Sequence, residues 1–215
     1  MGRNKYPEQT LERILDISTK LFIEKGYEQT SIQDILDALN LSKGGLYHHF
    51  KSKEEILEAV MKKRAQYIAN KLNDMIQKTK AKNAKEKLKK ILYHLGNDSE
   101  SHMLDVVLTS QINNPYFVVD GLQTCVKQDA PIICKLIEEG IKDGSLQITQ
   151  PALCAEIFLM LLNFWTNPTL YGRDFSETKE RLEYLQSIMC LLGLDIIDSD
   201  FITSILSGYE KMGAF

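Results

Sequence analysis

Apolar positions recur along the chain with the period of a helix, and no segment shows the alternation of a β-strand. One helical face is formed by Leu11, Ile14, Leu15, Leu21 and Phe22. A second face follows Gly26, a residue typical of helix ends, and consists of Ile32, Ile35, Leu36 and Leu39. The pattern predicts an all-α protein.

A third helix is expected directly after the second. Asn40 and Leu41 form the connecting turn, and Asn40 tolerates the left-handed backbone better than most other residues. Ser42 then begins a short helix with Leu46 and Phe50 on its inward side, four residues apart.

Two capping patterns fit the start of the second helix. Thr30 with Gln33, or Ser31 with Asp34, has the spacing of a capping box, and the sequence does not choose between them. Either residue pair would satisfy backbone amides of the first turn.

Helices account for the rest of the chain as well. Ser52 and Glu55 have capping-box spacing at the start of a fourth helix, which continues to about Thr79. Further helices are predicted at 84–95, 102–113, 116–128, 131–143, Pro151–Asn167, Ser176–Leu192 and 200–210.

Composition indicates a globular protein and offers no sign of catalysis. The 215 residues are 44% hydrophobic, and the most apolar run, Ile157–Trp165, is too short to cross a bilayer. No signal-peptide pattern is present, so a cytoplasmic location is expected.

No nucleophile elbow, carboxylate pair or phosphate loop is present either, so we expect neither an enzyme nor a cofactor.

The four cysteines are widely spaced and lack the intervals of a zinc site. Each falls in an apolar helical stretch, which predicts reduced, buried thiols. The adjacent His48 and His49 do not face together on a helix, so they do not suggest a metal site.

Charge is distributed unevenly along the sequence. Residues 1–95 contain 19 Lys and Arg and 12 Asp and Glu, a net +7, whereas residues 96–215 contain 7 and 17, a net −10. A basic first half is consistent with an anionic partner. A solvated basic helix face explains it equally well, because much of the excess lies in residues 78–90.

The short link between the second and third helices has the spacing of a helix-turn-helix, whose second helix enters the DNA major groove. Gly44 and Gly45 would let the backbone approach DNA closely, with the first-turn amides facing phosphate. Lys43 can reach a base edge or a phosphate.

The following turn adds further donors. Tyr47, His48 and His49 can donate to phosphate oxygens, and Lys53 places a cation beside the groove. Because Leu46 must face inward, the polar residues around it face outward.

The stretches "FIEKGYEQTSIQDIL" and "LSKGGLYHHFKSKEEIL" resemble the DNA-binding domain of the TetR (tetracycline repressor) family of bacterial regulators. The resemblance covers about a quarter of the chain. It implies that Thr30, Ser31 and Gln33 touch the DNA backbone or a base. It further implies recognition contacts from Ser42, Lys43, Gly44 and Tyr47, phosphate contacts from His49 and Lys53, and a role in sequence choice for His48. Asn40 and Gly45 depart from the family pattern.

The resemblance also implies a two-domain regulator. Residues 1–52 would form the helix-turn-helix domain and residues 53–215 a ligand-sensing and dimerisation domain. The expected function is repression from a pseudo-palindromic operator in double-stranded DNA, bound as a homodimer through Pro151–Asn167 and Ser176–Leu192 and released by a small-molecule inducer. The alternatives are an activator of the same family and a helical interaction protein without DNA binding.

An inducer pocket is expected among the central helices, mostly apolar with a few polar anchors. The candidate lining residues are His102, Met103, Val107, Gln111, Tyr116, Phe117, Phe158, Asn163, Trp165 and Tyr171.

Overall fold

The computed structural model describes residues 7–98, 107, 110–112 and 114–215, with only the backbone of Pro7 and Tyr116. Every regular element among these residues is helical, which confirms the all-α prediction. Contacts divide the chain into an N-terminal unit, residues 1–68 with 101–110, and a C-terminal unit, residues 69–100 with 111–215. Each unit has its own core of buried side chains.

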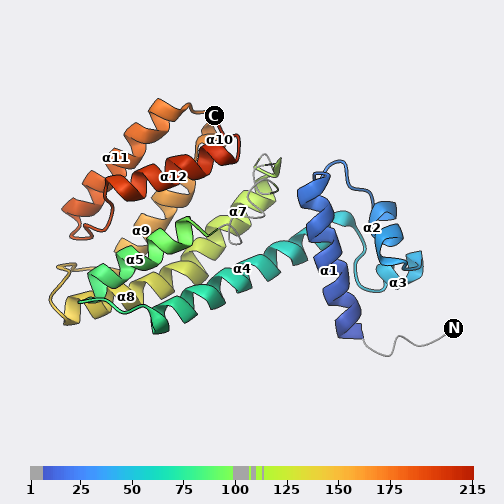
Figure 1. Ribbon diagram of the computed structural model, residues 1–215, viewed down its shortest axis with the longest axis horizontal. Coiled ribbons are helices and arrows are strands. Elements are labelled where there is room, and N and C mark those ends of the chain that lie inside the picture. Colours follow the sequence, from blue (N-terminus) through green and yellow to red (C-terminus); the bar gives the residue numbers. More distant parts are fainter. Residues whose placement is uncertain (1–6, 99–106, 108–109, 113) are drawn as a thin grey trace. The chain divides into compact units, whose positions relative to one another are not determined.

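The N-terminal unit contains three short helices and the start of a long one. These are α1 (Pro7–Glu24), α2 (Ile32–Leu39), α3 (Lys43–Tyr47) and the first part of α4 (Lys53–Lys78). Figure 1 shows α2 and α3 joined by a short turn beside α1. Ile14, Ile35, Leu46 and Ile56 bring one buried side chain from each helix into the core.

The division between the units falls inside α4, not at residue 52 as the sequence suggested. The reason is that Ile56, Leu57 and Val60, in the first turns of α4, are buried in the N-terminal core. Leu72, further along the same helix, belongs to the C-terminal core.

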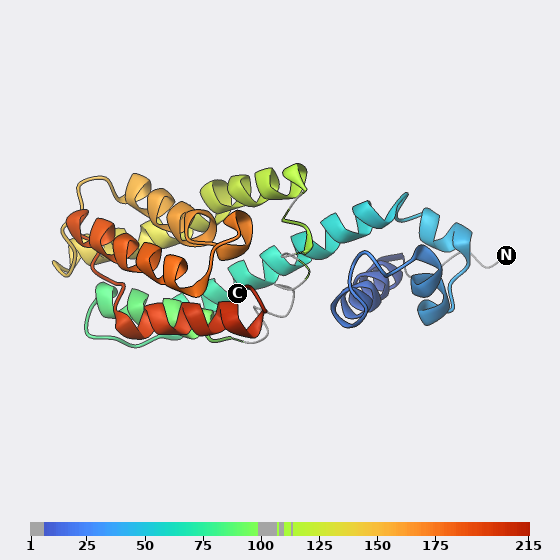
Figure 2. The same ribbon diagram turned by 90° about the horizontal axis from the view of Figure 1, so that it is seen from above.

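The C-terminal unit is a bundle of helices. Its elements are α5 (Ala84–Gly96), α7 (Pro115–Thr124), α8 (Ala130–Lys142), α9 (Pro151–Met160), α10 (Pro168–Tyr171), α11 (Phe175–Leu191) and α12 (Ser199–Lys211). Helix α8 packs against α5 and α9, while α12 packs against α5 and α11 (Figures 1 and 2). The helix expected at 102–113 lies mostly outside the described residues. None of the described helices is both long and apolar enough to span a membrane.

The bundle contains two π-helical segments. Segment η1 (Cys125–Asp129) lies between α7 and α8, and segment η2 (Leu161–Trp165) follows α9. In η1 the Ala130 amide donates to the Cys125 carbonyl five residues back. A proline follows shortly after each segment, at 131 and 168. Because proline lacks an amide proton and clashes with the carbonyl four residues earlier, the wider turn of η1 accommodates Pro131 within a continuous helix, whereas Pro168 begins the separate helix α10. The two helices predicted around Pro131 are therefore one continuous helical run.

Three lysines of the lysine-rich segment, residues 78–90, are neutralised within the C-terminal unit. Three ion pairs join α5 to carboxylates from the second half of the chain: Lys85–Asp195 at 2.5 Å, Lys87–Glu139 at 3.5 Å and Lys89–Asp198 at 2.7 Å. The side chains of these lysines are 21–32% exposed. This part of the charge asymmetry therefore reflects internal pairing and gives no evidence for an anionic partner.

The cysteines differ in exposure. Cys125 and Cys154 are buried, as predicted, whereas Cys134 is half-buried and Cys190 is exposed. Cys190 lies in the last turn of α11 beside Leu191, whose exposed fraction is 88%. The prediction of buried thiols is therefore wrong for Cys190, because this turn faces outward.

Candidate nucleic-acid interface

Ser31 is the residue that caps α2. Its hydroxyl accepts from the Asp34 amide at 3.1 Å, and the Asp34 carboxylate accepts from the Ser31 amide at 2.7 Å. Lys25 also contacts that carboxylate, at 2.7 Å. The hydrogen bond from Lys25, followed by those from Ser31, holds the pKa of Asp34 well below its usual range. Of the two capping patterns, the structure adopts Ser31 with Asp34.

Thr30 is directed into the protein and not toward solvent. Its exposed fraction is 1%, and its hydroxyl donates to the carbonyl oxygen of Gly26 at 2.7 Å. Its amide is bonded to the same carbonyl at 3.1 Å. The implied role of Thr30 as a DNA contact is therefore corrected, because both of its donors stabilise the turn before α2.

The turn between α2 and α3 is left-handed at Asn40, with φ 50° and ψ 45°. This confirms the prediction for Asn40, which is the only non-glycine residue with positive φ in the described part of the chain. Ser42 then caps α3 by accepting from the Gly45 amide at 3.2 Å. Leu46 and Phe50 are buried, as their spacing predicted.

The two glycines of α3 have different surroundings. A Cβ atom added to Gly45 would lie 3.1 Å from Cδ1 of Leu41, so the small residue there is explained by internal packing. A Cβ atom added to Gly44 would meet nothing within 4 Å. Nothing inside the protein thus requires glycine at 44, and the open space lies on the exposed side of α3.

Several polar side chains surround Gly44 on this exposed side. Tyr47 is 44% exposed, and the Lys43 ammonium lies 6.0 Å from the centre of its ring. His48 is exposed and His49 half-buried, and their rings meet edge to face at 5.2 Å. These side chains can present an ammonium, a phenol and imidazole donors to an anionic surface.

Gln33 is exposed on α2, and its amide donates to Asp37 at 2.7 Å. The side chain is therefore accessible from solvent. A contact with DNA would have to compete with this bond within the helix.

Lys53, the first residue of α4, lies against Tyr27. Its ammonium donates to the carbonyl oxygens of Tyr27 at 2.8 Å and Glu28 at 3.4 Å, and stands 4.3 Å from the centre of the Tyr27 ring. The Tyr27 hydroxyl contacts a carboxylate oxygen of Glu54 at 3.4 Å. Burial, with the nearby Glu54 and Glu28, raises the pKa of Tyr27 to about 12, so its ring stays neutral.

Tyr27 was not among the residues that the sequence singled out. It lies 26 positions before Lys53, and no local pattern links the two.

Glu55 differs in detail from the predicted capping box, because its carboxylate accepts from the Lys51 amide and not from that of Ser52. The Ser52 hydroxyl does accept from the Glu55 amide, at 3.3 Å.

The residues proposed for an inducer pocket lie in different surroundings. His102 and Met103 lie outside the described residues, as does the side chain of Tyr116. Val107 belongs to the N-terminal core and Phe158 to the C-terminal core. Both side chains are buried among other core residues, and their place in an inducer pocket stays a prediction.

Of the other members of that set, Asn163 and Trp165 lie in η2. Gln111 is buried and Phe117 is half-buried, as is Trp165, whereas Asn163 and Tyr171 are exposed. Segment η2 lies beside α7 and η1.

A Cβ atom on Gly121 of α7 would lie 3.4 Å from the Phe164 ring of η2. Burial raises the pKa of Cys125 in η1 to about 11, and a hydrogen bond with the Asn163 side chain acts in the opposite direction. Residues of the two π segments therefore meet in one region of the C-terminal unit.

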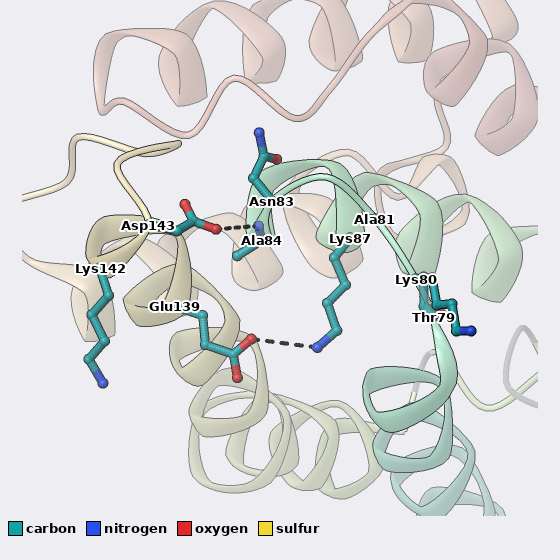
Figure 3. A pocket seen from close by; sticks show the side chains of 9 residues that line it. All are labelled: Thr79, Lys80, Ala81, Asn83, Ala84, Lys87, Glu139, Lys142 and Asp143. Atoms are coloured by element: carbon teal, nitrogen blue, oxygen red, sulfur yellow. Dashed lines mark hydrogen bonds and ion pairs between the residues drawn. The ribbon is translucent and has the colours of Figure 1, made fainter.

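An open pocket of about 710 Å³ lies elsewhere in this unit, between the end of α4, the start of α5 and the end of α8 (Figure 3). None of the proposed inducer residues lines it. Asp143 accepts from the Ala84 amide at 2.7 Å, and Lys87 is paired with Glu139. These contacts join α5 to α8, so the pocket lies where the two helices are held together.

Comparison with known proteins identifies the N-terminal region. Residues 14–60 match the bacterial regulatory proteins of the tetR family. The chain is 25% identical over 146 residues to the HTH-type transcriptional repressor KstR2 of Mycolicibacterium smegmatis, covering 66% of this chain and 69% of that protein. It is 23% identical over 184 residues to IcaR of Staphylococcus aureus, the negative transcriptional regulator of the biofilm operon icaADBC, covering 85% and 97%.

Solved structures share the fold. A TetR-family transcriptional regulator from Pectobacterium atrosepticum superposes with a TM-score of 0.67 at 20% identity, covering 89% of this chain and 97% of that one. The likeness thus extends beyond residues 14–60 to most of the C-terminal unit.

Proposed function

Because residues 14–60 carry the DNA-binding domain of the tetR family, we propose that this transcriptional regulator represses its target genes from a pseudo-palindromic operator. The observation that carries the proposal is the surface of α3. Leu46 faces the core, Gly44 is open to solvent, and Lys43 and Tyr47 flank it on the exposed side.

This surface fits the major groove of DNA. Lys43 and Tyr47 would contact base edges or phosphates, while Gly44 lets the helix approach the groove floor. The helix would be positioned by contacts with the DNA backbone from Ser42, His48, His49 and Lys53. Contacts of the same kind would come from Ser31 and Gln33 at the start of α2. The protein would act in the cytoplasm, where DNA is accessible.

A homodimer is the second part of the proposal, since two recognition helices are needed for a palindrome. Its support is an apolar surface on α9 and α11 that the chain itself does not cover. Leu153 and Ile157 are 54% and 42% exposed on α9, and Tyr184 and Leu191 are 62% and 88% exposed on α11. A second copy that brings the same helices would bury these side chains in an intersubunit bundle.

A small-molecule inducer is the third part. We place its site in the C-terminal unit, where Gly121 and Cys125 adjoin Phe164 and Asn163 of η2. π-Helical segments recur at functional sites, and this region combines the Phe164 ring and the Cys125 thiol with the Asn163 amide. The ligand class we propose is neutral and lipophilic, since apolar side chains contribute to the region.

The test is binding to genomic DNA fragments as salt is varied, together with a reporter gene. Binding should weaken steeply with salt, because phosphate contacts release counterions. Expression of the protein should lower the reporter signal from a bound fragment. A rise in that signal would identify an activator, whereas no salt-dependent binding to any fragment would contradict the DNA-binding assignment.

Coupling between inducer and DNA is tested through Trp165, the single tryptophan, which lies 6.3 Å from Tyr184 between ring centres. A ligand that changes Trp165 fluorescence should also weaken operator binding. The operator should weaken ligand binding by the same factor, because coupling is reciprocal. A ligand that changes the fluorescence but leaves DNA affinity unaltered would show that the two sites are independent.

A further inference from the structure

We propose that Tyr27 is a positioning residue for DNA binding, which acts by holding the Lys53 ammonium in place at the start of α4. The inference rests on the proposed DNA-binding function and assigns a role to a residue that does not itself face DNA. Tyr27 is 5% exposed and belongs to the N-terminal core.

Three contacts fix the Lys53 ammonium. The Tyr27 ring centre is 4.3 Å away, and the carbonyl oxygens of Tyr27 and Glu28 accept from it at 2.8 and 3.4 Å. An ammonium on an aromatic face is attracted by the negative centre of the ring. Since an ammonium has three donors, two carbonyl bonds leave one proton for a phosphate oxygen.

The ring itself is held rigidly. Phe22, almost fully buried, meets Tyr27 edge to face with ring centres 5.1 Å apart. The hydroxyl at the far end of the Tyr27 ring contacts Glu54, the residue that follows Lys53. Tyr27 thus binds two neighbouring charges of opposite sign at different parts of one side chain, the cation on its face and the carboxylate at its hydroxyl.

The consequence for DNA binding is preorganisation. A lysine side chain at a helix end normally samples many rotamers, and ordering it on a phosphate opposes binding. The contacts with Tyr27 restrict the rotamers of Lys53 before DNA binds, so less side-chain entropy is lost on binding. Without the aromatic face, Lys53 would keep its charge and its two carbonyl bonds but lose one of the three contacts that restrict its position.

The experiment is a double-mutant cycle with Tyr27→Leu and Lys53→Ala, measured by fluorescence anisotropy with a short labelled duplex of mixed sequence. Lys53→Ala should weaken binding and reduce the salt slope by about one unit. Tyr27→Leu should weaken binding about twofold to fivefold, as expected for loss of a cation–π contact of modest strength. In the Lys53→Ala background, Tyr27→Leu should have no further effect, because its action passes through the ammonium.

Two variants separate positioning from folding. Ile14→Val removes buried volume from the same core without altering the Phe22, Tyr27 or Lys53 side chains, so it should lower thermal stability yet leave the salt slope unchanged. Tyr27→Phe keeps the ring face and should retain the wild-type salt slope. All measurements are made well below the unfolding temperature of each variant.

A signal in the absence of DNA tests the contact directly. The ε-methylene protons of Lys53 should show a ring-current shift in their NMR spectrum, kept in Tyr27→Phe and lost in Tyr27→Leu. Equal losses of affinity from Tyr27→Leu with and without Lys53 would overturn the positioning role. Failure of the wild-type protein to bind the duplex at low salt would instead contradict the proposed function itself.

Discussion

The hydroxyl of Thr30 donates a hydrogen bond of 2.7 Å to the carbonyl oxygen of Gly26. The bond closes the turn between α1 and α2 and lies in the protein interior, since Thr30 is almost fully buried. In the same unit Ser18 is also fully buried, but its hydroxyl has no hydrogen-bond partner among the described residues. The two hydroxyls therefore provide a matched comparison.

Thr30→Val should destabilise the protein by about 0.5–1.5 kcal/mol, because the hydroxyl bond to the Gly26 carbonyl is lost while the Thr30 amide still donates to it. Ser18→Ala should be neutral or stabilising, since it removes a buried hydroxyl that forms no bond. Urea unfolding followed by circular dichroism measures both. A large loss of stability in Ser18→Ala would show that its hydroxyl is bonded in solution.

Gly44→Ala and Gly45→Ala should separate DNA approach from packing. At Gly44 a methyl group meets no protein atom, so stability should be unchanged or rise by up to about 1 kcal/mol from helix propensity. DNA binding should nevertheless weaken, because the methyl group occupies the approach surface. Gly45→Ala should be the less stable variant, since its Cβ would press on Leu41. Unaltered DNA affinity in Gly44→Ala would contradict close approach at that position.

Tyr47→Phe should weaken DNA binding without a change in thermal stability, because the exposed hydroxyl contributes no core volume. Leu46→Ala, at the neighbouring buried position, should destabilise the domain by about 2–5 kcal/mol. Thermal unfolding and anisotropy measured on the same preparations test the pair. Equal losses of stability would show that the two faces of α3 are assigned wrongly.

Asp34→Asn should reduce stability at neutral pH and have less effect in acid. The bonds from Lys25 and Ser31 depress the pKa of Asp34 in the folded state, so its carboxylate adds stability above the unfolded pKa of about 3.9. That contribution is lost as pH falls from there toward the folded pKa. Unfolding measured across this range should show the variant and wild type converging. Glu24→Gln is the control, since Glu24 only forms an exposed pair with Lys20 at 3.9 Å.

Leu191→Glu should shift the protein from dimer to monomer, because it places a charge in the apolar surface of α9 and α11. Tyr93→Glu is the matched control, since Tyr93 is an exposed apolar residue on α5, away from that surface. Sedimentation equilibrium gives the association state of each. A monomeric wild-type protein at micromolar concentration would contradict the dimer.

The periodic pattern was sufficient to predict the helices of the N-terminal unit and most of their buried faces, but Leu11, expected on the first face, is 37% exposed. Leu46 and Phe50 are buried as their spacing required, because a helix face follows directly from sequence intervals. The sequence could not relate Tyr27 to Lys53, since only the folded chain brings those distant positions together. It also could not choose between Thr30 and Ser31 as the cap, because both residue types fit the same spacing.

The helices around the prolines were harder to predict. Separate helices were expected on either side of Pro131, whereas the π segment η1 lets one helical run continue past it. The short α10 was missed although its signals are present. Asn167 caps it with a 3.0 Å bond to the Thr169 amide, Pro168 begins it, and Gly172 ends it in the left-handed conformation. At four residues, it is too short to show a periodic face.

The π turn at Cys125–Asp129 also sets the rotational phase of one half of a helix relative to the other. Each residue advances an α-helix by about 100°, so the wider turn works as one inserted residue between α7 and α8. Ile133, Leu136 and Ile137 of α8 face the core in the register that follows this insertion. Deleting one residue within Cys125–Asp129 would rotate all three about 100° relative to α7, and would bring Pro131 back against an α-helical carbonyl.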